Sequence, residues 1–184
     1  MALKSYTPAM PTNKKTIYLA RHAKSSWNSD AKNDFDRPLS KRGLKDANRI
    51  GLKLRSLDCQ PDAIIASPAQ RARQTCQILS EHIGFESDQI IWDDAVYAAY
   101  TVSLLHTLNA VAESKRAVML VGHNPSMEDL LLHFCGQAIW QRHAQENGKL
   151  FTTGNVAEIS FVGEWQKLAM GDANLVRLLR PKEL

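Results

Sequence analysis

The chain has 184 residues, 44% of them hydrophobic and 23% charged, and its formal net charge is +4 at pH 7. This composition excludes an intrinsically disordered chain, and no apolar run approaches the roughly 18 residues that a membrane-spanning helix needs. At roughly 150 residues per domain, we expect one domain over residues 15–184, after a polar leader over residues 1–14 without the apolar core of a secretory signal. The three cysteines, odd in number and without a CxxC spacing, favour reduced thiols and a cytoplasmic location.

The first half of the chain alternates predicted strands and helices. Short apolar runs predict buried strands, and apolar residues at spacings of three and four predict helices. In chain order we expect a strand at 16–20, a polar loop from 21 to about 38, and a helix that Ser40 caps. The apolar face of this helix is formed by Leu44, Ala47, Ile50, Gly51 and Leu54. A strand at 63–66 and a helix at 69–82 that ends near Gly84 follow.

The second half continues this alternation as far as a different tail. We expect a strand around 89–92, a helix at 102–112, a strand at 117–121, and a helix with Pro125 in its first turn through about residue 134. The tail predicts strands at 156–161, 165–169 and 175–179, the first two forming a hairpin across Gly163 and Glu164. Alternating strands and helices predict a three-layer α/β/α domain with a central, mostly parallel sheet, which is mixed because the hairpin is antiparallel.

Cationic and imidazole side chains follow three of the predicted strands. Arg21 and His22 follow the first strand, Arg71 comes shortly after the second, and His123 follows the strand at 117–121. Ligands of α/β domains bind at the carboxyl ends of the strands, so these side chains meet in one pocket if the strands are neighbours. Arginine matches phosphate oxygens bidentately, and imidazole forms covalent intermediates as a nucleophile. The residues themselves therefore predict phosphoryl chemistry.

Four motifs resemble those of the histidine phosphatase superfamily, the phosphoglycerate mutase-like group. In chain order they are Tyr18-Leu19-Ala20-Arg21-His22-Ala23, Arg37-Pro38-Leu39-Ser40-x-x-Gly43, Ser67-Pro68-x-x-Arg71-Ala72-x-Gln74-Thr75 and Gly122-His123-Asn124-Pro125. The Arg-His-Ala-Lys-Ser-Ser-Trp segment and the short chain are similar to the SixA-type branch of phosphohistidine phosphatases. The resemblance extends from about residue 18 to 161 and implies a phosphoglycerate mutase-like fold and a hydrolase.

The resemblance implies a role for each matching residue. His22 would be the nucleophile that becomes phosphohistidine. Arg21 and Arg71 would hold the phosphoryl oxygens, and His123 would donate a hydrogen bond to the same group. No metal or other cofactor is expected, because the arginines and histidines supply the positive charge.

Further candidates come from the loop after the nucleophile and from a later carboxylate. Asn28, six residues after His22, and Ser25 are expected to contact the substrate. Asp94 is the carboxylate that aligns best with the acid of other members, although Asp is one methylene shorter than the usual Glu. Ala23 replaces the usual Gly after the histidine, which requires a negative φ there.

Three functions remain open at this point. The first is hydrolysis of phosphohistidine through His22, since imidazole, with a pKa near 6.5, is a good leaving group. The second is hydrolysis of a small phosphomonoester with Asp94 as the acid, and the third is a non-catalytic module that binds a phosphorylated ligand. Accordingly we expect a phosphorylated protein histidine or a small phosphorylated metabolite as partner, and neither nucleic acid nor a membrane, because Lys and Arg are scattered. Ser67 lacks a G-x-S-x-G context and is interpreted as part of a turn.

Overall fold

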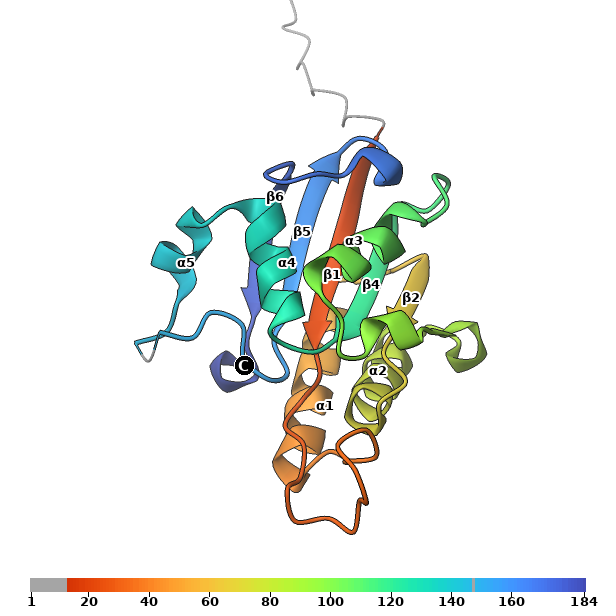
Figure 1. The fold of residues 1–184 in the computed structure, drawn as a ribbon, viewed down its shortest axis with the longest axis vertical. Helices are drawn as coiled ribbons and strands as arrows, with labels where there is room; N and C mark the ends of the chain where they lie inside the picture. The colour runs from red at the N-terminus through yellow and green to blue at the C-terminus, as the bar shows by residue number, and fades with distance from the viewer. Residues whose placement is uncertain (1–12, 147) are drawn as a thin grey trace, which may run out of the picture.

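A computed structural model describes residues 13–146 and 148–184, with a six-stranded sheet at its centre (Figure 1). The strands are β1 (Lys14–Arg21), β2 (Ala63–Ala66), β3 (Ile91–Trp92), β4 (Ala117–Gly122), β5 (Val156–Val162) and β6 (Ala173–Leu179). Their order in the sheet is β3-β2-β4-β1-β5-β6. The strands from β3 to β1 are parallel, whereas β5 is antiparallel to both β1 and β6. The mostly parallel, mixed sheet predicted from the sequence is confirmed.

Helices cover both faces of the sheet (Figure 1). The α-helices of the described residues are α1 (Lys41–Ser56), α2 (Gln70–Ile83), α3 (Thr101–Asn109), α4 (Ser126–Cys135) and α5 (Ala138–His143). Because successive side chains of a strand point to opposite faces, Ile17 and Leu19 pack in the core with α3 and α4. Tyr18 and Ala20 pack in the other core, with α1 and α2. The predicted three-layer α/β/α architecture is therefore confirmed.

Helix α1 begins where the sequence predicts. The side-chain oxygen of Ser40 caps it by accepting a hydrogen bond from the Gly43 N–H at 3.0 Å. Leu44, expected on the apolar face, is 41% exposed, and Gly43 lies buried beside it. A Cβ at Gly43 would lie 2.1 Å from the carbonyl oxygen of Lys24, so only glycine lets the loop after β1 pack this closely on the helix.

The tail differs from the prediction at one element. Residues 165–169, expected as a strand, begin with a single 3-10 turn, Trp165–Lys167, and β5 forms its hairpin with β6 instead. Trp165 is the reason, because its side chain is fully buried, packs edge-on against Phe161 and donates its indole N–H to the Lys115 carbonyl at 2.9 Å. The chain therefore turns inward at this tryptophan, and the return strand starts only at Ala173.

Two further differences concern the ends of elements. Helix α5 has no counterpart among the predicted elements. The predicted leader lies outside the described residues except for Asn13 and Lys14, and Lys14 already belongs to β1. No helix within the described ranges is both long and apolar enough to cross a membrane.

Candidate active site

Neighbouring strand ends bring the predicted residues to one edge of the sheet. In the β1–β4 pair Arg21 lies opposite Gly122, so His22 and His123 follow at the same level. The His22 N–H continues this pairing by donating to the Gly122 carbonyl at 3.0 Å. Strand β2, on the other side of β4, adds Ser67 at the same edge. The sheet register thus places two imidazoles and a hydroxyl side by side.

His22 is a buried, neutral imidazole. Its ring centroid lies 5.0 Å from that of His123, and 8% of the residue is exposed. Its Nδ1 lies 2.7 Å from the Ala23 carbonyl oxygen, which only accepts, so Nδ1 carries the proton and Nε2 keeps the lone pair. Burial, helped by His123, Arg71 and Arg21, lowers the pKa of His22 to about 3 although the Ala23 carbonyl opposes this. His22 is therefore uncharged at neutral pH.

His123 is oriented to donate a hydrogen bond. Its Nε2 lies 2.8 Å from the Ser67 hydroxyl, which already accepts the Ala69 N–H at 3.3 Å. The hydroxyl keeps its proton for donation to Nε2, and in that tautomer Nδ1 carries the ring proton. This Nδ1 is buried and has no hydrogen-bond partner among the described residues. Burial, with Arg71 acting in the same direction, lowers the pKa of His123 to about 4, so it too is neutral.

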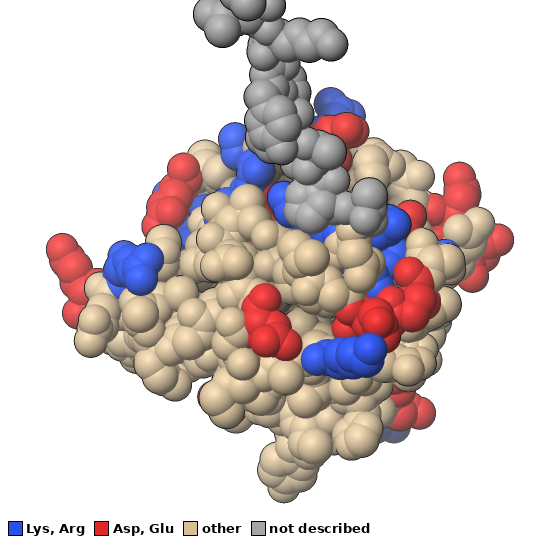
Figure 2. Space-filling view, turned by 90° about the horizontal axis from the view of Figure 1, so that it is seen from above, with Lys and Arg blue, Asp and Glu red and all other residues tan. Residues whose placement is uncertain are grey.

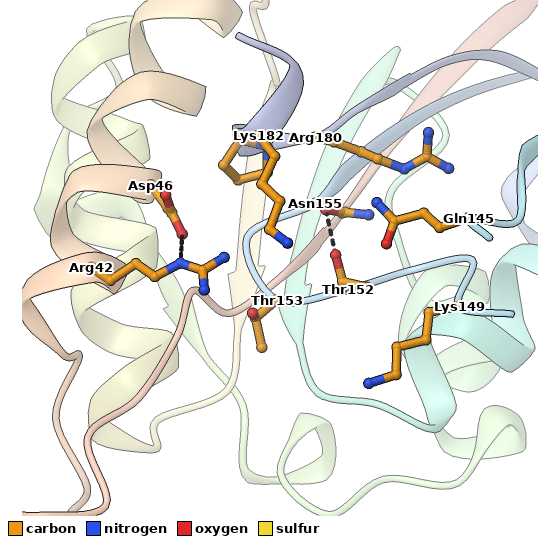
Figure 3. Close-up of a pocket in the computed structure, with 10 residues that line it drawn as sticks. Arg42, Asp46, Gln145, Lys149, Thr152, Thr153, Asn155, Arg180 and Lys182 are labelled. Atoms are coloured by element: carbon orange, nitrogen blue, oxygen red, sulfur yellow. Dashed lines mark hydrogen bonds and ion pairs between the residues drawn. The ribbon is translucent and has the colours of Figure 1, made fainter. Parts of the chain in front are cut away.

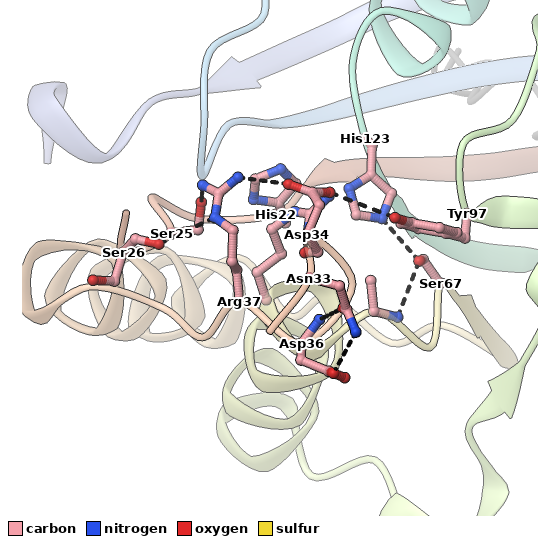
Figure 4. A network of polar contacts seen from close by, with 12 residues as sticks. His22, Ser25, Ser26, Asn33, Asp34, Asp36, Arg37, Ser67, Tyr97 and His123 are labelled. Carbon is pink, nitrogen blue, oxygen red and sulfur yellow. Dashed lines mark hydrogen bonds and ion pairs between the residues drawn. The ribbon is translucent and has the colours of Figure 1, made fainter. Parts of the chain in front are cut away.

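Arg71, in the first turn of α2, is bound by Asp34. Its Nη1 donates to the backbone carbonyl of Asp34 at 2.5 Å and its Nη2 to the carboxylate at 2.8 Å. Arg37 donates to the same carboxylate at 2.6 Å, and the Tyr97 hydroxyl lies 3.5 Å from it (Figure 4). Burial would raise the pKa of Asp34, but the two arginines hold it below its ordinary value. An ionised carboxylate thus occupies the guanidinium that is expected to hold a phosphoryl group.

Arg21 is fixed from the opposite side. Its Nη1 donates to the Phe151 carbonyl at 2.7 Å, an acceptor that it shares with the Asn124 side chain at 2.9 Å. The Phe151 N–H in turn donates to Glu128 at 2.8 Å. The Nε of Arg21 is buried without a partner among the described residues. Burial lowers the pKa of Arg21, and Glu128 opposes this shift.

Residues of two sequence motifs form hydrogen bonds with the loop that follows His22. Thr75 accepts the Ala23 N–H at 3.0 Å, and the backbone at Ala23 avoids positive φ, as a residue with a Cβ requires. Arg37 donates to the Ser25 hydroxyl at 2.6 Å and to the Ser26 carbonyl at 3.1 Å (Figure 4). Ser25 is therefore buried beside the site and occupied by an arginine.

Two predicted residues lie apart from this cluster. Asn28 is exposed in the loop after His22 and forms no hydrogen bond to the cluster within the described residues. Asp94 is exposed at the start of the 3-10 turn Asp94–Val96, and its carboxylate forms no hydrogen bond or ion pair with the cluster, although its backbone carbonyl accepts the Tyr97 N–H at 3.0 Å. Tyr97, from the same segment, does reach it, since its ring packs edge-on against His123 with centroids 5.6 Å apart. The roles predicted for Asn28 and Asp94 stay predictions.

Three residues of the cluster were not predicted. Ser67 does form the predicted turn, because its hydroxyl accepts the Ala69 N–H, but the same hydroxyl also binds His123, which was not predicted. Its place directly after a buried strand was a usable signal, because the other strand ends provide His22 and His123 in the same way. Asp34 and Tyr97 gave no such signal, since their positions depend on the paths of two irregular segments.

Known proteins resemble this chain in sequence and in fold. The family model of the histidine phosphatase superfamily (branch 1) matches residues 17–95. A candidate phosphohistidine phosphatase SixA from Agrobacterium tumefaciens is 31% identical, with a TM-score of 0.75 over 94% of this chain and 99% of that one. A candidate SixA from Nakamurella multipartitia is 28% identical, with a TM-score of 0.77 over the same shares. A phosphoglycerate mutase from Plasmodium falciparum, 17% identical with a TM-score of 0.60 over 90% of each chain, shares the fold.

The fold and these matches define a phosphatase of the phosphoglycerate mutase-like fold. The chain belongs to the histidine phosphatase superfamily, and within it to the SixA-type branch.

Proposed function

We propose that this protein hydrolyses phosphohistidine without a metal ion, through a phosphohistidine intermediate on His22. The observation that carries the proposal is the hydrogen bond from His22 Nδ1 to the Ala23 carbonyl, beside His123. It leaves the Nε2 lone pair of a neutral imidazole available to attack phosphorus. The nucleophile therefore needs no base to remove a proton at neutral pH.

In the first step His22 Nε2 forms a bond to phosphorus, and the P–N bond to the substrate imidazole breaks. The departing imidazole takes a proton from solvent. His22 then carries a positive charge, which is stabilised by the hydrogen bond that its Nδ1–H donates to the Ala23 carbonyl oxygen at 2.7 Å. In the second step the oxygen of a water molecule forms a bond to phosphorus and the P–Nε2 bond breaks. Phosphate leaves as H₂PO₄⁻ with both hydrogens of that water, and His22 is again a neutral imidazole.

Three cationic or donor groups surround the position of the transferring phosphoryl group. Arg71 offers a planar fork once Asp34 moves away, and Arg21 Nε and His123 Nδ1 are buried donors without a partner among the described residues. Donors that are fixed before the reaction stabilise charge that develops on the phosphoryl oxygens. This arrangement supplies positive charge from side chains alone.

Phosphohistidine is the favoured substrate because an imidazole leaving group needs little help from an acid. The site agrees with this requirement, since the Asp34 carboxylate, which binds Arg71, is held ionised by Arg71 and Arg37. We also propose a cytoplasmic location, which three unpaired cysteines favour.

The test is a turnover assay with a phosphohistidine peptide labelled in its phosphoryl group. Wild-type protein is expected to turn over in the presence of a chelator and to carry an acid-labile label. His22→Ala is expected to lose both turnover and label, whereas His106→Ala, which removes an exposed imidazole from α3, is expected to keep them. Full activity of His22→Ala would reject the mechanism.

A further inference from the structure

A hollow with a cationic lining lies between α1, the loop before β5 and the C-terminal segment (Figure 3). Its volume is about 130 Å³. Four cations and one carboxylate are among the residues that line it, namely Arg42, Lys149, Arg180, Lys182 and Asp46. One water molecule needs roughly 10–15 Å³ of such space, so the hollow has ample room for a small oxyanion.

Asn155 provides a buried donor at the base of this hollow. The residue is fully buried, and its Oδ1 accepts the Thr152 hydroxyl at 3.1 Å. Its Nδ2 has no hydrogen-bond partner among the described residues. Figure 3 shows Asn155 beside Thr152, with the end of Lys182 directed at the same space. Because buried donors are nearly always paired, this amide marks a position where an acceptor binds.

The charged groups around the hollow are only partly compensated. Arg42 Nε lies 3.3 Å from the Asp46 carboxylate, and Arg180 pairs with Glu183 at 3.1 Å. Lys182 is exposed and forms no ion pair within the described residues. An anion that enters therefore meets a net positive lining.

The hollow is connected to the catalytic residues. The Asn155 carbonyl accepts the Arg21 N–H at 3.0 Å, so the donor amide belongs to the residue that fixes the end of β1. An adjoining hollow is lined by Arg21 and Asn124 and shares Lys149 and Thr152 with the first. A substrate held at Arg21 can thus extend a second anionic group toward Asn155.

The positive charge continues over the surface of α1. Lys41, Lys45 and Arg49 line a shallow groove together with Arg42 and Lys182. Figure 2, in contrast, shows Lys and Arg next to Asp and Glu on the face at the other end of the parallel strands. Cations that are scattered along the sequence thus lie together along this groove, where they would attract an acidic segment.

We propose that this hollow binds a carboxylate or phosphate-type oxyanion next to the transferring phosphoryl group. Resting on the function proposed above, the substrate is then a protein segment with acidic residues beside its phosphohistidine. The same oxyanion chemistry would also bind inorganic phosphate, the product of the reaction. Two experiments separate these sources.

The first experiment measures binding without catalysis. Inorganic phosphate is titrated into ¹⁵N-labelled protein, and the side-chain NH₂ resonance of Asn155 is followed. We expect a saturable shift in the wild type and in Arg71→Gln, with affinity about fivefold weaker in Lys182→Gln and Arg42→Gln. Arg55→Gln, which removes the same charge from the last turn of α1, is the matched control and is expected to bind as the wild type does.

The second experiment compares two phosphohistidine peptides with Glu or Gln at the positions beside the phosphorylated residue. We expect the wild type to prefer the Glu peptide about fivefold in kcat/KM, through KM, and Lys182→Gln and Arg42→Gln to lose this preference. Lys14→Gln, an exposed lysine at the start of β1, is expected to keep it.

The outcomes assign the occupant of the hollow. An Asn155 shift together with the Glu preference supports the acidic substrate. A shift without the preference assigns the hollow to inorganic phosphate and overturns the acidic substrate. No shift in the Asn155 resonance overturns the oxyanion site. If neither peptide turns over, the proposed phosphatase function fails, while the phosphate titration still decides the site.

Discussion

Both terminal nitrogens of the Arg71 guanidinium are bound by Asp34, one by its backbone carbonyl at 2.5 Å and the other by its carboxylate at 2.8 Å. A carboxylate and a phosphoryl group fit the same planar fork. Substrate must therefore displace the Asp34 side chain, or bind against its negative charge. In the structure as it stands, the loop after β1 competes with the ligand for this arginine.

Replacing Asp34 with Ala is expected to tighten the binding of inorganic phosphate by about fivefold to tenfold, because a competing anion and its repulsion are removed. The measurement is the inhibition constant of phosphate against phosphohistidine peptide. Asp30→Asn removes a charge from the same loop and is expected to leave the constant unchanged, since Asp30 is exposed and contacts no residue of the cluster. Weaker phosphate binding in Asp34→Ala would mean that Asp34 supports the bound ligand rather than competing with it.

Ser67 is expected to act as a positioning residue for His123. Ser67→Ala removes the hydroxyl at 2.8 Å from His123 Nε2 and lets the ring proton move between the two nitrogens. We expect kcat to fall about tenfold, the rate equivalent of one hydrogen bond, with KM changed little. The control is Ser80→Ala, which removes a buried hydroxyl from α2 without touching the cluster. An equal loss of kcat in both variants would indicate a general effect on the fold.

The strand ends of the site were predictable from the sequence because each is a short apolar run followed at once by a polar residue. Arg21 and His22 after β1, and His123 after β4, needed only the assumption that these strands are neighbours. Their convergence follows from parallel pairing and is independent of the loops. The geometry of the central residues could therefore be anticipated.

The contacts made by irregular segments could not be predicted in this way. Asp34 reaches Arg71 only because Arg37 holds the loop to Ser25 and Ser26, a set of contacts with no period in the sequence. The hollow with the cationic lining could not be predicted for the same reason, since its residues come from α1 and from the C-terminal segment. Trp165 misled the prediction because an alternating apolar pattern does not distinguish a strand from a turn that buries one large side chain.

The two neutral histidines are expected to make the protein less stable in mild acid. Their folded pKa values, about 3 for His22 and about 4 for His123, lie below the value near 6.5 of an unfolded histidine. Below pH 6.5 the unfolded chain therefore binds protons at these histidines that the folded chain does not bind, and the free energy of unfolding falls as the pH drops. Between pH 7.5 and 5 each histidine is expected to remove about 2 kcal/mol from the free energy of unfolding.

Urea denaturation of wild type and His22→Asn at both pH values measures this contribution. The wild type is expected to lose about 2 kcal/mol more than the variant. His106→Asn, which removes an exposed histidine, is expected to lose as much as the wild type. Asp34 does not interfere, because the stability that its lowered pKa contributes is present above the ordinary range of a carboxyl, near pH 4, and is lost only as the pH falls below it. Equal losses in wild type and His22→Asn would show that His22 is charged in the folded protein.

Asp94 separates the two phosphatase hypotheses. Its carboxylate is exposed and contacts no residue of the described cluster, whereas Tyr97 packs against His123. We therefore expect Asp94→Asn to change kcat/KM less than twofold for phosphoramidate and for glycerol 3-phosphate alike, since neither reaction draws a proton from it. Tyr97→Ala removes the ring beside His123 and is expected to slow both substrates severalfold. A strong loss in Asp94→Asn on the alcohol phosphate alone would instead identify Asp94 as the acid, and would favour a phosphomonoester as the natural substrate.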